Sequence, residues 1–428
     1  TLPNSTIAYN RKNEFLSMIS EFDVVIIGGG VNGCAIAREL SSHFHGRFCL
    51  IEKENSVALH TSGRNSGVIH SGINQKPGTL KAKLVVKGNR IMREYCKKKS
   101  IPMEQVGTLV VANNDEEVKT LRELERRAKE NGVPSVSIIS SNDLKKIEPN
   151  IEGVEALISP TGSIVDSKKL VEALASDASN MGVDFFMNTK LLDVKEYQDH
   201  IDIFTNNKTF RTKFLVNCAG LYADKIAHAL GVGKDYIIIP FSGGYYKLIN
   251  KNENLIKTMV YSTPNLEVPF LGVHFTKMVD GAVFIGPNAS LAPGREAYNL
   301  SSINLFEMLA YLFNIRFLRL ILNRNFLKMA LRELWLTLSR EAFTNDARKL
   351  LPQIQTKGLM KMPPGIRAQL VDKKGNLVGD FVYKSTKNSY HILNAVSPAF
   401  TSSMAFAEKI ISYLQQNQLN WLHKKEEN

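Results

Sequence analysis

Short apolar runs and helical stretches alternate at the start of the chain. Residues 22–27 are almost wholly apolar, as in a strand buried on both faces, and residues 47–51 repeat this pattern. Between them, residues 34–42 place apolar side chains at the three- and four-residue spacing of a helix. The order strand, helix, strand predicts the first unit of a parallel sheet.

Three glycines follow the first strand at a meaningful spacing. Gly28, Gly30 and Gly33 form the pattern GxGxxG. The first permits a tight turn, the second lets the backbone approach a pyrophosphate, and the third lets the helix lie close on the strand. Glu52 follows the second apolar run, where a carboxylate can accept hydrogen bonds from a ribose. Together these four residues predict a dinucleotide site.

The middle of the chain leaves this pattern and then returns to it. We expect an inserted subdomain at 76–155, with its helices and strand at 80–99, 106–112 and 115–131. Strand patterns resume at 182–187, 191–196, 200–205 and 214–220. The last of these is a buried run that ends at a glycine. We predict that it lies beside the first strand in the sheet.

The second half of the chain predicts a different sheet. Strands at 236–239, 244–248 and 282–285 suggest an antiparallel substrate sheet, which helices within 302–351 would cap. The chain then ends on a strand at 390–396, a loop at 397–403 and a helix at 404–415. We therefore expect a discontinuous nucleotide domain and a substrate and cap domain, after an N-terminal extension. Their residues are 20–75, 156–235 and 360–428 for the first, 76–155 and 236–359 for the second, and 1–19 for the extension.

Composition and charge limit the classes of partner and the cellular compartment that fit this chain. The chain has 428 residues and a formal net charge of +13, which favours an anionic small molecule or a phospholipid surface as partner. The basic residues are spread along the chain and form no nucleic-acid module, so we expect no nucleic-acid partner. Four cysteines stand singly, which argues against a disulfide framework and a metal site and favours a reducing compartment. No stretch reaches the roughly 18 apolar residues of a membrane span.

A loop rich in glycine and hydroxyl groups follows Glu52. It runs from His60 to Gly72 and offers backbone N–H groups and one arginine to a diphosphate and to the polar edge of a ring. An ordinary solvated turn is the alternative. The candidate cofactor contacts in and before this loop are Lys53, Ser62, Arg64, Asn65, Ser66, Gly67 and Val68.

The chain resembles the FAD-dependent D-amino-acid oxidase-like family, and within it the L-2-hydroxyglutarate dehydrogenases and oxidases. The matching stretches run almost from end to end, apart from residues 1–20 and about 300–360, and are 62–73, 76–77, 80–83, 216–224, 269–276, 286–289, 365–369, 375–378 and 397–403. The resemblance implies an α/β fold, with a Rossmann-like FAD-binding domain and a second α+β substrate domain on an antiparallel sheet. It also implies non-covalent FAD and oxidation of a 2-hydroxy acid, with hydride transfer to flavin N5.

The same resemblance assigns roles to further residues. Arg367 matches an arginine that holds the substrate carboxylate, and a guanidinium suits that task. Residues 397–403 match the loop and helix start beside the flavin. The implied cofactor contacts outside the first loop are Leu191, Ala219, Gly220, Pro398, Thr401, Ser402 and Ser403.

Oxidation of a secondary alcohol needs a base for the hydroxyl proton. Imidazole has a suitable pKa, and His274 and His70 are the two candidates. Either could instead be a structural residue, and the sequence does not choose between them.

The chain also departs from the family at two positions. Relatives usually carry arginine at the place of Ser242 and a lysine near Gly294. If a missing cation serves the second carboxylate of a five-carbon diacid, Lys247 and Arg295 are possible substitutes. Tyr245, in the aromatic pair after Ser242, is a further candidate for the substrate site.

Alternatives to this interpretation concern the substrate, the cofactor, the presence of turnover, the electron acceptor and the compartment. A glycerol-3-phosphate oxidase or another 2-hydroxy-acid oxidase of the same superfamily is the nearest, followed by a flavoprotein without turnover and an NAD-dependent dehydrogenase. Residues 306–322 are apolar with interspersed arginines, as in a segment that enters an anionic membrane interface or in a packed cap helix. Electrons would pass to a quinone, an electron-transfer flavoprotein or oxygen. We expect an intracellular enzyme, at the matrix side of the mitochondrial inner membrane in a eukaryote, or cytoplasmic or peripheral to the inner membrane in a bacterium.

Overall fold

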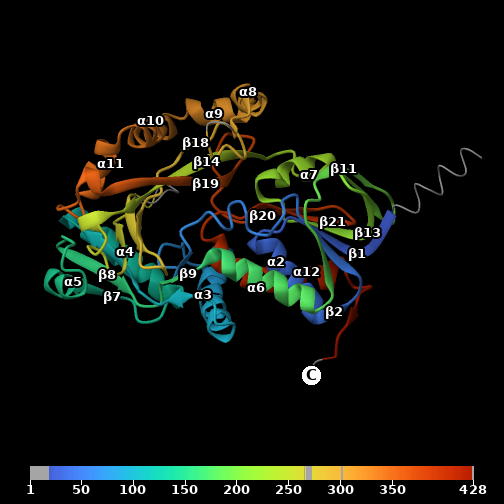
Figure 1. The fold of residues 1–428 in the computed structure, drawn as a ribbon, viewed down its shortest axis with the longest axis horizontal. Helices are drawn as coiled ribbons and strands as arrows, with labels where there is room; N and C mark the ends of the chain where they lie inside the picture. Colours follow the sequence, from blue (N-terminus) through green and yellow to red (C-terminus); the bar gives the residue numbers. More distant parts are fainter. Residues whose placement is uncertain (1–18, 265, 267–271, 300–301, 427–428) are drawn as a thin grey trace, which may run out of the picture.

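The computed structural model describes residues 19–264, 266, 272–299 and 302–426. The expected N-terminal extension lies outside the described residues, except that Ile19 already begins the first strand. Two large sheets organise the chain, one at each side of the view in Figure 1.

The first sheet is mixed and carries the glycine turn. Its order is β10-β3-β1-β13-β12-β11, and β21 pairs with both β13 and β20. The strand bounds are β1 Ile19–Ile27, β3 Phe48–Ile51, β10 Val183–Phe186, β11 Leu191–Glu196, β12 Ile201–Thr205, β13 Thr209–Asn217, β20 Val382–Ser385 and β21 Ser389–Asn394. Strand β13 runs parallel to β1, with Val24 opposite Phe214, so the predicted neighbour of the first strand is confirmed.

Helices cover the first sheet because their apolar faces and the strands share one core. On one face this core joins Val24 and Leu50 of the sheet to Leu40, Leu174 and Phe406 of the helices. The helices are α2 Val31–His43, α3 Leu80–Lys98, α6 Ser167–Asn180 and α12 Ala399–Asn417. On the opposite face, η1 Gly220–Tyr222 leads into α7 Ala223–Ala229.

The second sheet is largely antiparallel, as expected. Its order is β18-β14-β17-β16-β15-β6-β8-β7, and β19 pairs with β14. The strands are β6 Thr108–Ala112, β7 Ser137–Ser140, β8 Glu155–Ser159, β14 Ile237–Leu248, β15 Met259–Ser262, β16 His274–Lys277, β17 Val283–Ile285, β18 Ser290–Leu291 and β19 Leu359–Val371. Two strands were expected over 236–248, but β14 is one strand whose register shifts between Gly243 and Tyr245. A bulge of this kind bends a strand without ending it.

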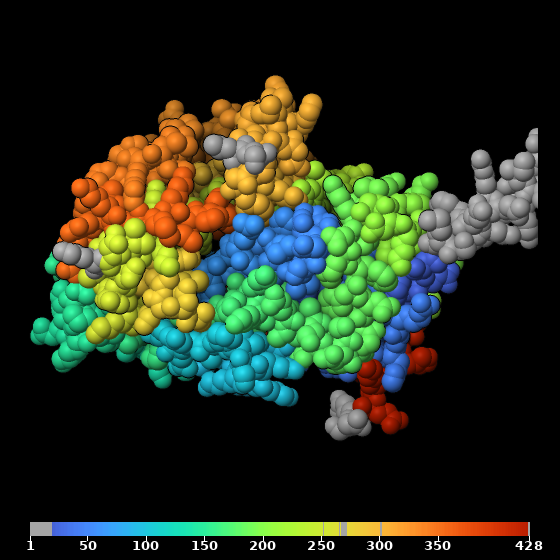
Figure 2. Space-filling model, in the orientation of Figure 1, coloured from blue at the N-terminus to red at the C-terminus, as the bar shows by residue number. Residues whose placement is uncertain are grey.

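Two groups of helices cover the second sheet. Helix α4 Asp115–Glu130 packs on one face, where Leu124 shares a core with Val110, and α5 Ser141–Ile147 packs on the other, where Leu144 shares a core with Leu109. The other group, α8 Leu305–Leu312, α9 Ile315–Leu322, α10 Arg324–Leu338 and α11 Arg340–Ala347, follows β14 and β19 along the upper edge of Figure 1. Figure 2 shows their orange atoms as one continuous edge of the molecule. Smaller elements complete the fold: β2 Phe44–His45 with β22 His423–Lys424, and β4 Val68–Ile69 and β5 Met103–Glu104 on β9 Ser163–Val165, with η2 Asn250–Asn252 and η4 Thr356–Gly358.

The chain passes between the two sheets at positions that differ from the expected boundaries. Helix α3 was assigned to the inserted subdomain, but Leu84 and Met92 belong to the core of the first sheet. Strand β19 was assigned to the nucleotide domain, but it pairs along most of its length with β14 of the second sheet. Both differences have one cause: an amphipathic element shows which face is buried, but not which sheet buries it.

Candidate active site

A cavity of about 1580 Å³ is lined by elements of both sheets. One end is formed by the glycine turn after β1, and the other by Tyr245, Tyr261, His274 and Arg367 of the second sheet. Sites for small ligands usually measure about 300–1,000 Å³, so this space suits a dinucleotide together with a small substrate.

The glycine turn brings the start of α2 against the end of β1. Gly28 has a φ of +107°, which favours glycine, and a Cβ at Gly33 would lie 2.0 Å from the carbonyl oxygen of Gly28. Only a glycine at the third position allows this approach. The N-terminus of α2 therefore faces the cavity with its positive dipole end.

Glu52 and Ser62 fix the surroundings of this turn. The Glu52 carboxylate accepts hydrogen bonds from the backbone N–H of Gly29, at 2.6 Å, and of Glu54, at 2.9 Å. Ser62 Oγ accepts one from the N–H of Val31 at 2.9 Å, which closes the loop over the start of α2. A carboxylate offers about four acceptor positions, so Glu52 retains capacity for a ribose.

A polar network joins the next residues to the segment after β18. Lys53 Nζ lies 2.7 Å from Glu296 Oε1, and His60 Nδ1 lies 2.8 Å from the hydroxyl of Tyr298. The guanidinium of Arg64 lies over the Tyr298 ring, 4.2 Å from its centre. These contacts tie the loop to residues 292–299 across the cavity mouth.

The same network contains a cluster that could hold a metal ion. Glu54, His60 and Glu296 place their ligand atoms within 4.8 Å of one another. However, the Lys53 ammonium forms ion pairs with both Glu54 and Glu296. The ammonium already lies between the two carboxylates and pairs with each, so this geometry does not favour a metal centre.

Most of the candidate cofactor residues line the cavity. Besides Gly28, Gly30 and Glu52, the described lining includes Lys53, Ser62, Arg64, Asn65, Ser66, Val68, Leu191, Ala219, Gly220 and Pro398. Gly33 and Gly67 lie behind the lining, where a Cβ would meet the backbone of Gly28 or of Val165.

Three candidates near the end of the chain are placed differently. We expected a loop over 397–403, but α12 begins at Ala399, so Thr401, Ser402 and Ser403 lie inside its first turns and are buried. None of the three is among the described lining residues. Thr401 Oγ1 instead accepts a hydrogen bond from the backbone N–H of His70, at 3.0 Å, and donates to the carbonyl of Val68. Thr401 therefore positions the loop that carries His70.

Two histidines meet at the substrate end of the cavity. His274 Nδ1 lies 3.0 Å from the carbonyl oxygen of Gly272, and its ring stacks on Tyr261 with centres 4.4 Å apart. Burial lowers the pKa of His274 to about 4. Burial, aided by the nearby His274, also lowers the pKa of His70 to about 4. Both rings are therefore neutral near pH 7, as a general base must be.

Arg367 and Tyr245 line the same end. Burial lowers the pKa of Arg367 to about 10, so its guanidinium remains charged at neutral pH. Burial raises the pKa of the Tyr245 hydroxyl to about 12, which keeps it protonated beside Ser66. Ser242 also lines the cavity, where relatives would place a cation.

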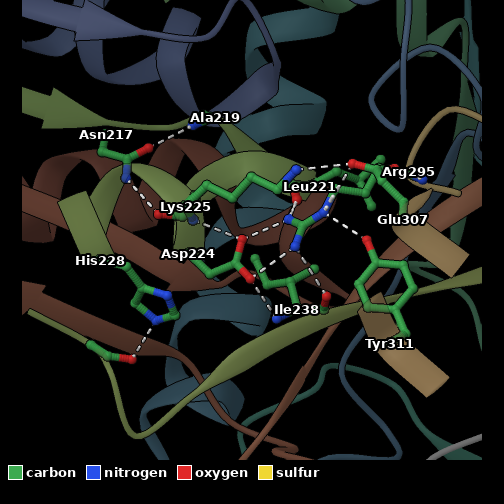
Figure 3. A network of polar contacts seen from close by, with 12 residues as sticks. Asn217, Ala219, Leu221, Asp224, Lys225, His228, Ile238, Arg295, Glu307 and Tyr311 are labelled. Atoms are coloured by element: carbon green, nitrogen blue, oxygen red, sulfur yellow. Dashed lines mark hydrogen bonds and ion pairs between the residues drawn. The ribbon is translucent and has the colours of Figure 1, made fainter. Parts of the chain in front are cut away.

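Arg295 does not belong to this group. It was a candidate for substrate binding, but it is not one of the described residues that line the cavity. Figure 3 shows it in a buried network, where its guanidinium pairs with both oxygens of Asp224, at 2.6 and 3.0 Å. It also donates to the hydroxyl of Tyr311 at 2.8 Å. Arg295 is therefore occupied in joining α7 to the segment after β18.

The cavity fits a dinucleotide by its own geometry. A Cβ at Gly30 would come within 3.0 Å of Ser62 Oγ, so only a bare backbone leaves room for a pyrophosphate between the turn and the loop. The family model described as FAD dependent oxidoreductase matches residues 23–413. The chain belongs to the FAD-dependent oxidoreductase family. FAD is therefore its cofactor, and the resemblance drawn from the motifs is confirmed.

Relatives in this family cover almost the whole chain. An L-2-hydroxyglutarate dehydrogenase, named as mitochondrial, from Nematostella vectensis is 38% identical over 94% of this chain and 92% of its own length. An L-2-hydroxyglutarate dehydrogenase from Indibacter alkaliphilus is also 38% identical, over 92% and 98%. In fold, the flavoenzyme resembles an L-alpha-glycerophosphate oxidase from Mycoplasma pneumoniae with FAD bound, with a TM-score of 0.75, 25% identity and coverage of 95% and 97%. The expected fold class is thereby confirmed.

Lys81 is a lining residue that the sequence analysis did not select. It stands in the matched stretch 80–83 and is the second residue of α3. Its position in a stretch that resembles the family was the available signal, but an amphipathic helix gives no reason to single out one of its lysines.

Proposed function

We propose that this flavoenzyme oxidises L-2-hydroxyglutarate to 2-oxoglutarate. The observation that carries the proposal is the convergence of Arg367, His70 and His274 on one end of a cavity that begins at the glycine turn. The relatives named above support the choice of substrate, because they are similar over more than nine-tenths of the chain.

Arg367 would bind the carboxylate next to the reacting carbon. A guanidinium binds a carboxylate through two parallel hydrogen bonds, which fixes the orientation of the hydroxy acid as well as its position. The side chain extends from β19 where this strand pairs with β14, with Arg367 opposite Phe241. Pairing on a long strand makes this anchor rigid.

His274 would take the hydroxyl proton. A carbonyl oxygen only accepts hydrogen bonds, so the contact with Gly272 assigns the proton of the neutral ring to Nδ1 and the lone pair to Nε2. The ring of Tyr261 holds the imidazole plane in place. FAD supplies the acceptor for the hydride that leaves the substrate carbon. His70 would then orient the hydroxyl group, with its backbone held by Thr401.

Anaerobic bleaching of the bound flavin tests this proposal. L-2-hydroxyglutarate, D-2-hydroxyglutarate, L-lactate and glycerol 3-phosphate are mixed with the enzyme in parallel. We expect rapid bleaching with L-2-hydroxyglutarate only. Bleaching by another compound of the panel alone would refute the substrate, and bleaching by none would refute turnover of this substrate class.

A glycerol-3-phosphate oxidase is the second candidate. It is favoured by the likeness to the glycerophosphate oxidase, which covers 95% of this chain at 25% identity. The bleaching panel separates the two, because only one of the two substrates carries a carboxylate for Arg367.

We also propose that the enzyme meets its electron acceptor at an anionic membrane surface. Helices α8 to α10 bury one face against the second sheet, where Phe317, Leu320 and Phe326 pack with Ile239 and Phe241. Large apolar side chains remain exposed on their outer face: Phe306 by 87%, Phe313 by 81%, Leu322 by 78% and Leu338 by 77%. Residues 306–322 were expected to be either a packed cap helix or a membrane-surface segment. The packed face of these helices fits the first alternative, and their exposed face fits the second.

Charge favours this membrane contact over an aqueous partner. Residues 303–340 contain six cations, Arg316, Arg319, Arg324, Lys328, Arg332 and Arg340, against Glu307 and Glu333. Both acids are partly buried and form ion pairs. Apolar side chains among exposed cations are typical of segments that lie in an anionic interface. Among the described helices, none has the length and apolarity to cross a bilayer.

Vesicle sedimentation tests the membrane proposal. The holoenzyme should sediment with vesicles that contain phosphatidylglycerol and much less with pure phosphatidylcholine. The variant Phe306→Ser with Phe313→Ser should lose most of this binding but keep its rate of flavin reduction. Equal sedimentation of wild type and variant would refute the role of these helices. If the wild type binds the anionic vesicles as expected and the variant does not, a membrane-bound quinone is the acceptor that this location favours.

A further inference from the structure

The substrate end of the cavity contains a second cationic side chain besides Arg367. Lys81 lies in the first turn of α3, lines the cavity, and donates a hydrogen bond from Nζ to the carbonyl oxygen of Gly379 at 2.9 Å. Gly379 follows Val378, whose backbone N–H donates to Leu370 of β19, so Lys81 reaches the cavity beside the end of the strand that carries Arg367.

The charges around Lys81 are unbalanced. Burial and, to a smaller extent, the positive charge of Arg367 lower its pKa to about 8, so the two cations lie near each other. Among the described lining residues, the acids are Glu52, Glu54, Asp193, Glu296 and Glu307, which belong to the nucleotide end or to its mouth. Asp380, the one acid that acts on the Lys81 pKa, is exposed. Two like charges that lie close together repel each other, and a ligand with negative charge between them would relieve that repulsion.

Other cations can be set aside for this role. Arg295 is held by Asp224, and Lys247 is not among the described lining residues. Arg127 lines the cavity, but its guanidinium is paired with Glu123 at 2.7 Å. Ser242 carries no charge. Lys81 lines the cavity and lies close enough to Arg367 for the charge of Arg367 to lower its pKa.

We infer that Lys81 binds the second carboxylate of a dicarboxylate substrate, while Arg367 binds the carboxylate beside the reacting carbon. The inference rests on the proposed function and deepens it. Lys81 thereby selects diacids over monoacids. A charge-assisted hydrogen bond of this kind corresponds to about a 10- to 100-fold change in affinity.

Lys81→Met tests this role, with Lys83→Met as the matched control on the exposed face of the same helix. With L-2-hydroxyglutarate, Lys81→Met should raise KM at least about tenfold and change kcat little. With the monoacid L-2-hydroxybutyrate, its KM should stay within about twofold of the wild-type value. The control should behave as wild type with both compounds. An equal rise in KM for both substrates, or no rise for the diacid, would overturn the inference.

The pH dependence adds a readout that a merely structural lysine would not change. In the wild type, KM for the diacid should rise above about pH 8, because Lys81 loses its charge there, whereas KM for the monoacid should not. Lys81→Arg should remove the rise, since a guanidinium stays charged. A rise of equal size in wild type and Lys81→Arg would contradict the assignment.

A binding measurement separates this inference from the proposed function. Calorimetric titration of the holoenzyme with glutarate and with butyrate needs no turnover, so it reports on Lys81 even if L-2-hydroxyglutarate proves not to be oxidised. Glutarate should bind at least about tenfold more tightly than butyrate to the wild type, and Lys81→Met should abolish the difference. If glutarate binds no more tightly than butyrate to the wild type, the second carboxylate site does not exist.

Discussion

The buried ion pair between Arg295 and Asp224 allows a sharp test of what Arg295 does. Its side chain is almost fully buried and donates to both oxygens of Asp224, to the Tyr311 hydroxyl, and to the carbonyls of Leu221 and Ile238. Every one of these groups belongs to the protein. We therefore expect Arg295→Met to affect stability and to leave substrate binding unchanged.

The magnitude follows from the burial of both partners. Side chains of Arg295 and Asp224 are each only 4% exposed, so a methionine leaves a carboxylate without its counter-charge in a dry environment. Removing one partner of such a pair costs about 3–5 kcal/mol. Asp224 keeps its hydrogen bonds from the backbone N–H of Ile238 and Lys225, which favours the lower half of that range.

Urea unfolding and steady-state kinetics together measure the effect. We expect the free energy of unfolding to fall by about 3 kcal/mol in Arg295→Met, and KM for L-2-hydroxyglutarate to stay within twofold of the wild-type value. Adding Asp224→Asn should restore at least about 1 kcal/mol, because the amide removes the buried charge and still accepts from Ile238. A KM at least tenfold higher at unchanged stability would refute this reasoning and return Arg295 to the substrate site.

Three further outcomes are expected. Gly33→Ala should lose FAD during purification, because its Cβ would lie 2.0 Å from the Gly28 oxygen and would force α2 away from the glycine turn. Full flavin occupancy in the purified variant would contradict this. Gly88→Ala should lower the urea midpoint although alanine favours helices, because its Cβ would lie 2.4 Å from the backbone oxygen of Thr401. A higher midpoint would show that α3 and α12 separate easily. Stability should fall between pH 7 and pH 5, by about 2 kcal/mol per group at pH 5, because unfolding raises the pKa values of two buried histidines and one partly buried histidine from about 4 to about 6.5. The buried ones are His274 and His391, and the partly buried one is His70. An unchanged urea midpoint would contradict this prediction.

The nucleotide unit could be predicted from the sequence because each of its parts is local. The apolar run of β1, the glycines of the turn and the start of α2 follow one another directly, and steric limits on backbone approach require glycine at Gly28 and Gly33. Similarly, β11 was predicted with its observed bounds. Local sequence patterns were therefore enough to predict most strands of the first sheet.

The positions that the sequence did not predict depend on partners far along the chain. Arg295 looked like a cation available for substrate until the fold brought Asp224 beside it, 71 residues away in sequence. Thr401 lies in a run of small polar residues that is typical of a loop, but burial against the β4 loop extends α12 through it. Lys81 gained its position only when α3 packed with the first sheet. Tertiary contacts decided each of these cases.

The order of elements along the chain also bears on how the enzyme is made. The ribosome releases β1, the glycine turn and α2 early, but the core that supports them includes β21 and α12, which are the last large elements to emerge. Domains generally fold as units once their residues are available. FAD capture should therefore wait until synthesis is nearly complete, and a nascent chain arrested before α12 should hold no flavin although its whole GxGxxG turn is already outside the tunnel.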